Sequence, residues 1–126
     1  MDNCEHGEAI MSTAFNTALS ALRALGVKMD VHAHNIANVN TDGFKKSRVH
    51  MQQEPQGGIR VKIEQINTPG AVYGVNEKTG AELEGSNVGL AHEFVDQIVI
   101  RYAFEANILS IKTADKMQQT LLDLIG

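Results

Sequence analysis

The sequence predicts a mainly α-helical protein with a small β insert, in which long N- and C-terminal helices pack as a coiled-coil-like pair around a β-hairpin region. Apolar or small residues recur every three or four positions near both ends of the chain, but they alternate with polar residues in its middle. Aromatic side chains are few, with no Trp, two Tyr and four Phe among 126 residues. Paired aliphatic helices need fewer aromatic side chains than a compact globule does.

These patterns divide the chain into three parts. Residues 1–11 are predicted to be a disordered leader, because they are polar and show no periodicity. Residues 12–47 and 86–126 are predicted to form one helical domain, and residues 48–85 a small β-rich insert. Met11 is an alternative natural start of the chain. Within the leader, Cys4 and His6 are expected to be a mobile thiol and imidazole rather than a catalytic pair.

The first helix is expected to begin at Ser12 or Thr13, which can cap it, and to end at Ala37 or Asn38. The sequence carries little fixed charge there, so more than one helix face is expected to contact protein. The predicted seam follows the three–four spacing of a coiled coil and consists of Phe15, Ala18, Leu22, Leu25, Met29, His32 and Ile36. His32 and His34 are two residues apart, which favours packing roles over metal binding.

A turn is predicted at residues 38–43. This stretch resembles the opening of an EF-hand loop, but Val49 occupies the twelfth position, where calcium binding needs a bidentate Glu. Asn, Thr and Gly favour a fixed turn that ends the helix, with Phe44 as its apolar anchor. We therefore hypothesise that the turn sets the angle between the helix and the β region. The basic cluster Lys45, Lys46 and Arg48 is expected to be a solvated turn.

The middle of the chain is predicted to form short strands. Apolar and charged residues alternate from Ile59 to Glu64, which is typical of a half-exposed strand. Residues 71–73 and 81–83 are weaker strand candidates on either side of a turn at residues 76–80. A region this small cannot bury much core of its own, so we expect it to dock on the helices or on another subunit.

The second helix is predicted from Leu90 to Ile125, capped by Ser86 and Asn87. It would be roughly 50 Å long, so its apolar stripe needs an equally long partner. The stripe comprises Ile98, Tyr102, Ala106, Leu109, Thr113, Met117, Leu121 and Leu124.

Both ends of the chain also resemble a known family. Residues 35–45 (N-I-A-N-V-N-T-D-G-F-K) are similar to the N-terminal signature of the flagellar basal-body rod and hook axial proteins. The C-terminal part resembles the same family through S-N-V at 86–88, E-F-V-D at 93–96, Y-A-F-E-A-N at 102–107 and K-T-A-D at 112–115. The short middle region is most like that of a short proximal rod protein (FlgC-like), because distal rod and hook members carry larger middle domains.

The resemblance implies a structural subunit of the flagellar basal-body rod that polymerises through its terminal helices into a hollow helical structure. It implies copies of itself, other rod proteins and the flagellar export apparatus as partners. It also implies a periplasm-spanning location, reached by type III export without a cleaved signal peptide. We expect the isolated subunit to be partly disordered, since its helices would lack their lattice partners. The residues assigned to packing or assembly are Leu22, Leu25, Met29, Asn35, Ile36, Ala37, Asn38, Asn40, Thr41, Gly43, Phe44, Ile98, Tyr102, Ala106, Asn107, Leu109, Thr113, Met117 and Leu121.

No catalytic, cofactor-binding or metal-binding residues are predicted, and neither is a small-molecule substrate. A net charge of −4 argues against nucleic acid as a partner. The sequence contains no run of 18 apolar residues, so membrane insertion is not predicted. Cys4 is the only cysteine, so no intrachain disulfide can form.

Two alternatives remain. A helical adaptor or chaperone that binds partner helices would share the two-helix physics, although it would not account for both motifs. A small soluble enzyme is the weaker alternative, because the sequence shows no nucleophile–base set and no glycine-rich phosphate loop.

Overall fold

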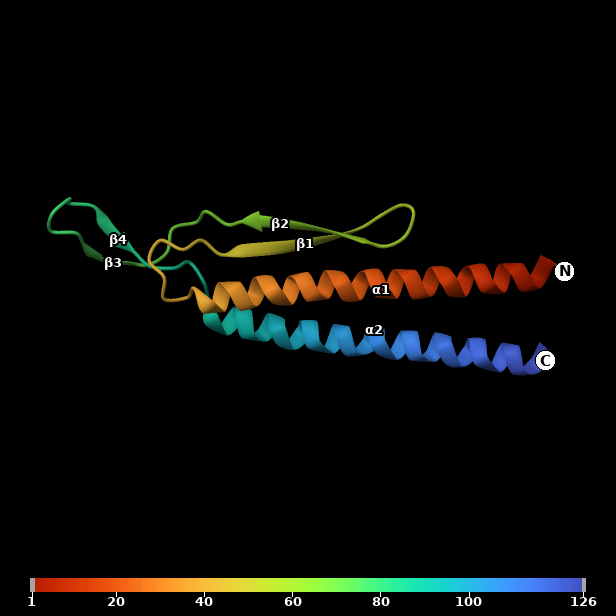
Figure 1. The fold of residues 1–126 in the computed structure, drawn as a ribbon. Coiled ribbons are helices and arrows are strands. Elements are labelled where there is room, and N and C mark those ends of the chain that lie inside the picture. Colours follow the sequence, from red (N-terminus) through yellow and green to blue (C-terminus); the bar gives the residue numbers. More distant parts are fainter. Residues whose placement is uncertain (1, 126) are drawn as a thin grey trace.

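Two long antiparallel helices form the body of the protein (Figure 1). The structure is a computed structural model that describes the backbone of residues 2–125 and the side chains of residues 12–124. Helix α1 (Asp2–Ala37) and helix α2 (Leu90–Ile125) each have 36 residues and lie side by side, with both chain ends at the same end of the pair. The predicted fold class, mainly α with a small β insert, is confirmed.

Helix α1 begins earlier than predicted. Its first residue is Asp2, which is earlier than the predicted start at Ser12 or Thr13. The disordered leader at residues 1–11 stays a prediction. Glu5, Glu8 and Met11 are good helix formers, and the single Gly7 costs only about 1 kcal/mol relative to Ala. The side chains of Cys4 and His6 lie outside the described residues.

The β region consists of two separate antiparallel hairpins. Strands β1 (Ser47–Gln53) and β2 (Ile59–Gln65) pair in one, and strands β3 (Val72–Val75) and β4 (Glu82–Glu84) in the other. Strands β2, β3 and β4 lie close to the predicted segments. Strand β1 was not predicted, although Val49 and Met51 alternate with polar residues in it. The predicted domain boundaries stay a prediction.

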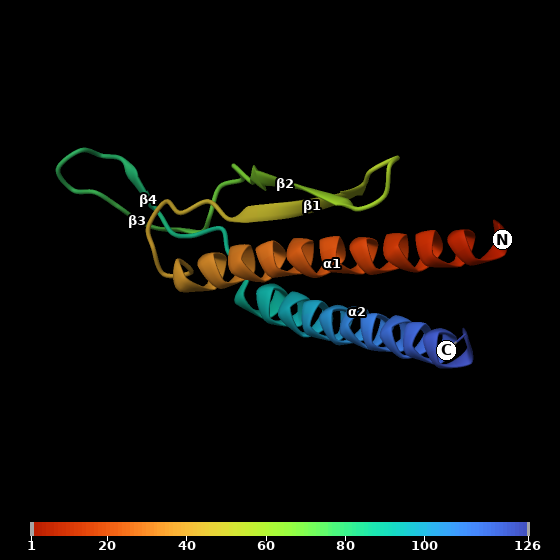
Figure 2. The ribbon, with the colours of Figure 1, turned by 45° about the vertical axis from the view of Figure 1, so that its right-hand side comes forward.

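The two hairpins leave the helical pair in opposite directions (Figures 1 and 2). The β1–β2 hairpin runs back along α1 and packs on it, and Val49 of β1 is buried. The β3–β4 hairpin extends beyond the end of both helices, and neither of its strands packs on a helix. The expected docking on the helices therefore holds for one hairpin and not for the other.

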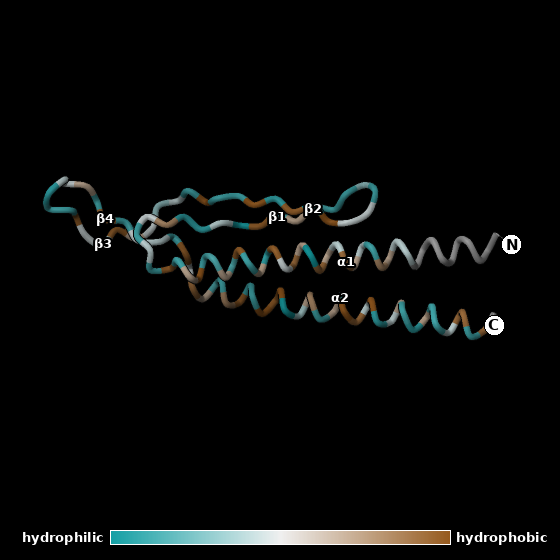
Figure 3. Tube along the Cα trace, viewed as in Figure 1, coloured by the Kyte–Doolittle hydropathy of each residue, from teal (hydrophilic) through white to brown (hydrophobic). Residues whose placement is uncertain are grey.

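The buried core lies toward the end of the helical pair that carries the β region. Its apolar members are Ala24, Leu25, Val49 and Ile100, and three polar side chains are buried beside them. Farther toward the chain ends, apolar positions of α2 continue in the hydropathy-coloured trace (Figure 3), but from Lys112 to Leu124 every residue except Ala114 is exposed. The outer half of α2 thus buries little surface against the rest of the described chain.

Candidate functional site

The predicted turn after α1 joins the helix to the β region. The Thr41 hydroxyl donates to Asn38 Oδ1 at 3.2 Å, and the Asn38 amide donates to the His34 carbonyl at 2.9 Å. Gly43 has φ 66°, in the left-handed region that favours glycine, and its N–H donates to the Glu84 carbonyl at 2.7 Å. The signature residues of this stretch therefore form a fixed turn, as predicted, and tie it to β4.

Phe44 is packed against the helix, whereas Ala37 and Asn40, two other residues assigned to assembly in this stretch, are not. The Phe44 ring packs edge-on against His34, with ring centroids 5.5 Å apart, which confirms its anchoring role. Ala37 and Asn40 are exposed.

Asn35 connects α1 to the first strand. Its side chain is 1% exposed and donates from Nδ2 to the Ser47 carbonyl at 2.8 Å, while Oδ1 accepts from the Ser47 N–H at 2.9 Å. The amide thus makes both bonds that a neighbouring strand would make. This geometry fixes the start of β1 against the helix.

A buried acid–imidazole pair joins the two helices beside Asn35. His32 Nδ1 lies 2.5 Å from Glu93 Oε2, and Asn35 Nδ2 donates to the same oxygen at 3.2 Å. Both His32 and Glu93 are buried, at 8% and 3% exposure. Because every member of the cluster has a partner, it fixes the position of α2 along α1 without leaving a buried polar group unsatisfied. The pairing of Glu93 with a seam histidine was not predicted.

Asn87 does not cap α2, so that prediction is wrong. Its Oδ1 accepts from the Lys46 N–H at 2.6 Å, and its Nδ2 donates to the Ile66 carbonyl at 2.7 Å. The side chain therefore bridges the chain before β1 and the chain after β2. Ser86 accepts from the Val88 N–H at 3.2 Å.

Glu84 holds the base of the second hairpin. Its carboxylate accepts from the Lys45 ammonium and from the Gly70 N–H, and these two hydrogen bonds, that of Lys45 first, lower its pKa. Lys45 also donates to the Thr68 carbonyl at 3.2 Å, so it is an anchored residue rather than part of a solvated turn. A Cβ on Gly70 would overlap the Gly85 carbonyl oxygen, which shows how closely the two chain segments approach.

A second contact at this base involves Tyr73. Its hydroxyl donates to Asp42 Oδ2 at 2.7 Å, and this hydrogen bond is the main cause of a raised Tyr73 pKa.

Most of the predicted apolar stripe of α2, from Ile98 to Thr113, faces away from α1, whereas Leu121 lies seven residues after Ala114 and continues the row on the other side. The members of the stripe are all exposed, among them Ile98 at 52%, Tyr102 at 60% and Leu109 at 65%. Helix α2 instead contacts α1 through a row on its opposite side, which includes Glu93, Ile100, Ala103, Asn107, Ile111 and Ala114. The sequence analysis predicted that the more apolar row of α2 packs on its partner helix. In the structure, α2 packs on α1 through the row with small and polar members.

Most residues of the predicted α1 seam are covered by the rest of the chain. Leu25 and His32 are buried, and Ala18, Leu22, Met29 and Ile36 are half-buried. Phe15, near the chain end, is 45% exposed. The α1 seam therefore lies against the rest of the chain, and only its outer end is uncovered.

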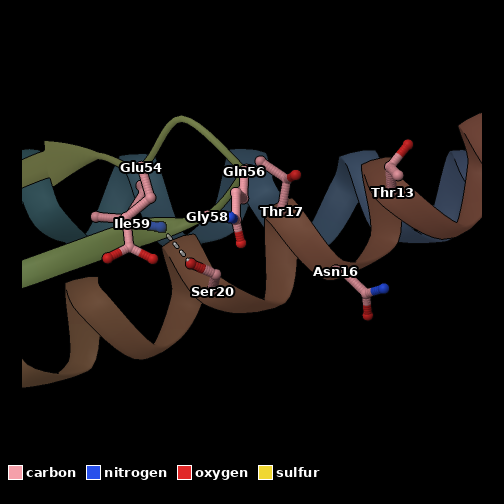
Figure 4. A pocket seen from close by; sticks show the side chains of 9 residues that line it. Thr13, Asn16, Thr17, Ser20, Glu54, Gln56, Gly58 and Ile59 are labelled. Atoms are coloured by element: carbon pink, nitrogen blue, oxygen red, sulfur yellow. Dashed lines mark hydrogen bonds between the residues drawn. The ribbon is translucent and has the colours of Figure 1, made fainter.

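A polar recess of about 280 Å³ lies between α1 and the loop of the β1–β2 hairpin (Figure 4). Ser20 Oγ accepts from the Ile59 N–H at 2.6 Å across it, and Glu54, at its edge, binds Arg60 at 2.6 Å. Within the described residues, no group of three or more His, Cys, Asp or Glu side chains could hold a metal ion. No described helix is long and apolar enough to cross a membrane.

Comparison with known proteins identifies the family. The family described as "Flagella basal body rod protein" matches residues 15–45, and "Flagellar basal body rod FlgEFG protein C-terminal" matches residues 80–124. The chain belongs to the flagellar rod and hook axial protein family. The N-terminal match contains the turn and Asn35, and the C-terminal match contains Glu84, Asn87, Glu93 and most of α2.

Two relatives are hook proteins of this family. The chain is 32% identical over 102 residues to the flagellar hook protein FlgE of Treponema pallidum and 28% identical over 110 residues to that of Borreliella burgdorferi. These alignments cover 79% and 86% of this chain but only 21% and 24% of the two hook proteins. The chain thus spans about a fifth to a quarter of the length of these curated relatives.

Proposed function

We propose that the protein is a structural, non-enzymatic subunit of the flagellar axial structure that polymerises through its terminal helices. The observation that carries this proposal is the outward apolar stripe of α2, exposed along most of a 36-residue helix. A helix that is apolar on both sides is normally buried. Because α1 covers only the opposite side, the stripe needs a partner from outside this chain.

Open-ended assembly accounts for this arrangement. A contact between different surfaces of successive copies, repeated by an operation that does not close, builds a helical filament. The inner row of α2 is already used within the chain, so the outer stripe is available for a lattice neighbour. The assembly residues are those of the predicted stripe, from Ile98 to Leu121, with the outer end of α1 beside them.

Within the flagellum, we place the protein in the basal-body rod rather than the hook. The connection between the two helices holds only two short hairpins, which favours a short proximal (FlgC-like) rod subunit. This placement implies type III export without a cleaved signal peptide, a periplasm-spanning location, and other rod proteins as neighbours. Nucleic acid, membrane lipid and small-molecule substrates are not expected partners.

The test is a pair of matched variants expressed in a strain that lacks the native gene. Ile98→Ser combined with Leu109→Ser removes two apolar groups from the outer stripe, and we expect loss of swimming and of assembled rods in isolated basal bodies. Ile63→Ser is the control, because Ile63 is a 53% exposed apolar residue outside the helices. Normal rods with the stripe variant would exclude the α2 stripe as the assembly surface. Intact rods in the gene-deleted strain would exclude the protein as a rod subunit.

Gly43→Val gives a second test of the same proposal. Valine is strained at the left-handed φ of this position, so the turn should shift and rod assembly should be impaired. Normal motility with this variant would contradict the role of the turn in setting the angle between helix and β region.

The adaptor alternative predicts a different state of the purified protein. An adaptor should form one small complex of fixed size, whereas a rod subunit should be a monomer that enters open assemblies as its concentration rises. Light scattering over a concentration series separates the two.

A further inference from the structure

The projecting β3–β4 hairpin carries charges that have no partner in this chain. Glu77, in the turn, and Glu82, on β4, form no ion pair within the described residues. Glu82 lies directly opposite Val75 in the strand register, so the two side chains share a face. Val75 is 57% exposed. This face therefore presents an apolar group beside the Glu82 carboxylate, and Glu77 and the exposed Lys78 lie in the turn next to it, beyond the end of the helices (Figures 1 and 2).

The outward face of the β1–β2 hairpin has the opposite character. Its cross-strand pairs are Arg48 with Glu64, His50 with Lys62 and Gln52 with Arg60, while Val49 on the other face is buried against α1. Glu64 is engaged by His50 at 3.1 Å and Arg60 by Glu54 at 2.5 Å. Arg48 and Lys62 are exposed and have no ion-pair partner among the described residues. This outward face is therefore basic.

The two faces cannot meet within one copy. The hairpins point in opposite directions from their common base, and the β3–β4 hairpin is held there by Glu84, by the bond from Gly43 and by the bond from the Gly85 N–H to the Ala71 carbonyl at 2.9 Å. A second copy displaced along the helix axis could place its basic face at the projecting hairpin. The aliphatic parts of Arg48 and Lys62 would then cover Val75.

We propose that the β3–β4 hairpin of one copy docks on the outward β1–β2 face of the next copy, with Glu77 and Glu82 against Arg48 and Lys62. The contact joins different surfaces of two copies, so it repeats along an open assembly and does not close. It rests on the proposed function and adds to the α2 stripe a second contact that fixes register. Exposed ion pairs contribute little energy individually, but juxtaposed like charges suppress wrong alignments.

Two complementary charge reversals test the contact with the full-length chain. The hairpin variant carries Glu77→Lys and Glu82→Lys, and the sheet variant carries Arg48→Glu and Lys62→Glu. Each alone should place like charges at every contact and should need at least about tenfold higher concentration to assemble, judged by light scattering and sedimentation. An equimolar mixture should assemble like wild type, because hairpin and sheet of unlike variants attract at every junction.

Mixing also separates this contact from a loss of folding. In the sheet variant, the carboxylate introduced at position 48 would face Glu64, which weakens the hairpin itself, but a weakened hairpin would not recover in a mixture. In a Cys4→Ser background, the pair Lys62→Cys and Glu82→Cys should form disulfides between copies of assembled protein. Failure of the mixture to recover, or assembly of each variant alone at the wild-type concentration, would overturn the proposal.

The outer-stripe variant Ile98→Ser with Leu109→Ser distinguishes the two proposals. If it fails to assemble while both charge variants assemble normally, the hairpin contact is wrong and the proposed function stands. If the stripe variant assembles normally while the mixture recovers, the hairpin contact stands and the α2 stripe is not the lattice surface. A hairpin variant that abolishes swimming without recovery on mixing would mean that the hairpin binds a different protein, which also overturns the proposal.

Discussion

The two ends of the helical pair are built in different ways. At the end that carries the β region, α1, α2 and β1 meet around buried Asn35, His32 and Glu93, and each polar group has a partner. At the end that holds the chain termini, the apolar side chains of α2 are exposed, with Leu124 at 83%. One end is completed by the chain itself, and the other depends on neighbours. A subunit of an open assembly needs both: a fixed shape and surfaces that only assembly buries.

The largest expected difference between the two ends is in local stability. In a dilute monomer, amide hydrogen exchange should be slow around Ala24, Leu25 and Ile100 and approach the rate of an unprotected peptide in the outer turns of both helices. Exchange should slow in those outer turns once assemblies form, because their apolar surface is then buried. Uniformly strong protection in the monomer would contradict the comparison.

Truncating one apolar residue on each side of α2 should show the same contrast. Ile100 is 2% exposed, and Ile100→Ala should lower the free energy of unfolding by about 3 kcal/mol, since it leaves a cavity. Leu109 is 65% exposed, so Leu109→Ala should change the free energy of unfolding of the monomer by less than about 0.5 kcal/mol. Denaturant unfolding followed by circular dichroism measures both, and equal effects would show that the two rows of α2 are not distinct.

Two asparagines give a matched comparison of amide roles. Asn35→Ala should cost about 2–3 kcal/mol, because it removes both bonds to Ser47 and leaves the part-buried backbone groups of Ser47 without these partners. Asn107 donates only to the Ala103 carbonyl of its own helix, at 2.8 Å, so Asn107→Ala should cost no more than about 1 kcal/mol. The same unfolding measurement applies. A small cost at Asn35 would mean that the end beside the β region is not held by this amide.

Two glycines should respond with opposite signs. Gly43→Val should destabilise by at least roughly 1–2 kcal/mol, because its φ of 66° is unfavourable for a side chain. Gly26 lies inside α1 with no heavy atom within 4 Å of an added Cβ, so Gly26→Ala should stabilise the monomer by up to about 1 kcal/mol. Thermal unfolding midpoints that shift in the same direction for both variants would contradict this reasoning.

The smallest effect should come from acid at the base of the β3–β4 hairpin. The folded-state pKa of Glu84 is lowered by Lys45 and Gly70, so its stabilisation is present above the unfolded-state pKa and is lost as the pH falls through the folded-state value. The Gly70 amide resonance should therefore shift as the pH falls below the ordinary range of a glutamate carboxyl, and Glu84→Gln should remove this shift. Glu77→Gln is the control, since Glu77 forms no ion pair within the described residues and should leave the Gly70 shift unchanged.

The sequence by itself determined the parts of this protein that depend on local chemistry. The three–four spacing predicted both helices, and Leu90 and Ile125 bound α2 as predicted. The turn at 38–43 was also predicted, because backbone preferences act between near neighbours. The motifs at the two ends were sufficient to indicate the flagellar family.

Only the tertiary structure decided which surfaces meet. It turned the most apolar row of α2 outward, and it paired Glu93 with His32 and Asn87 with the chain beside β1 and β2. These contacts join residues 21 to 61 positions apart. The physical reason is that hydrophobic periodicity shows that a face must be buried but not what buries it. When the same helix is apolar on two sides, the choice is made by the shape and polar partners of the rest of the fold.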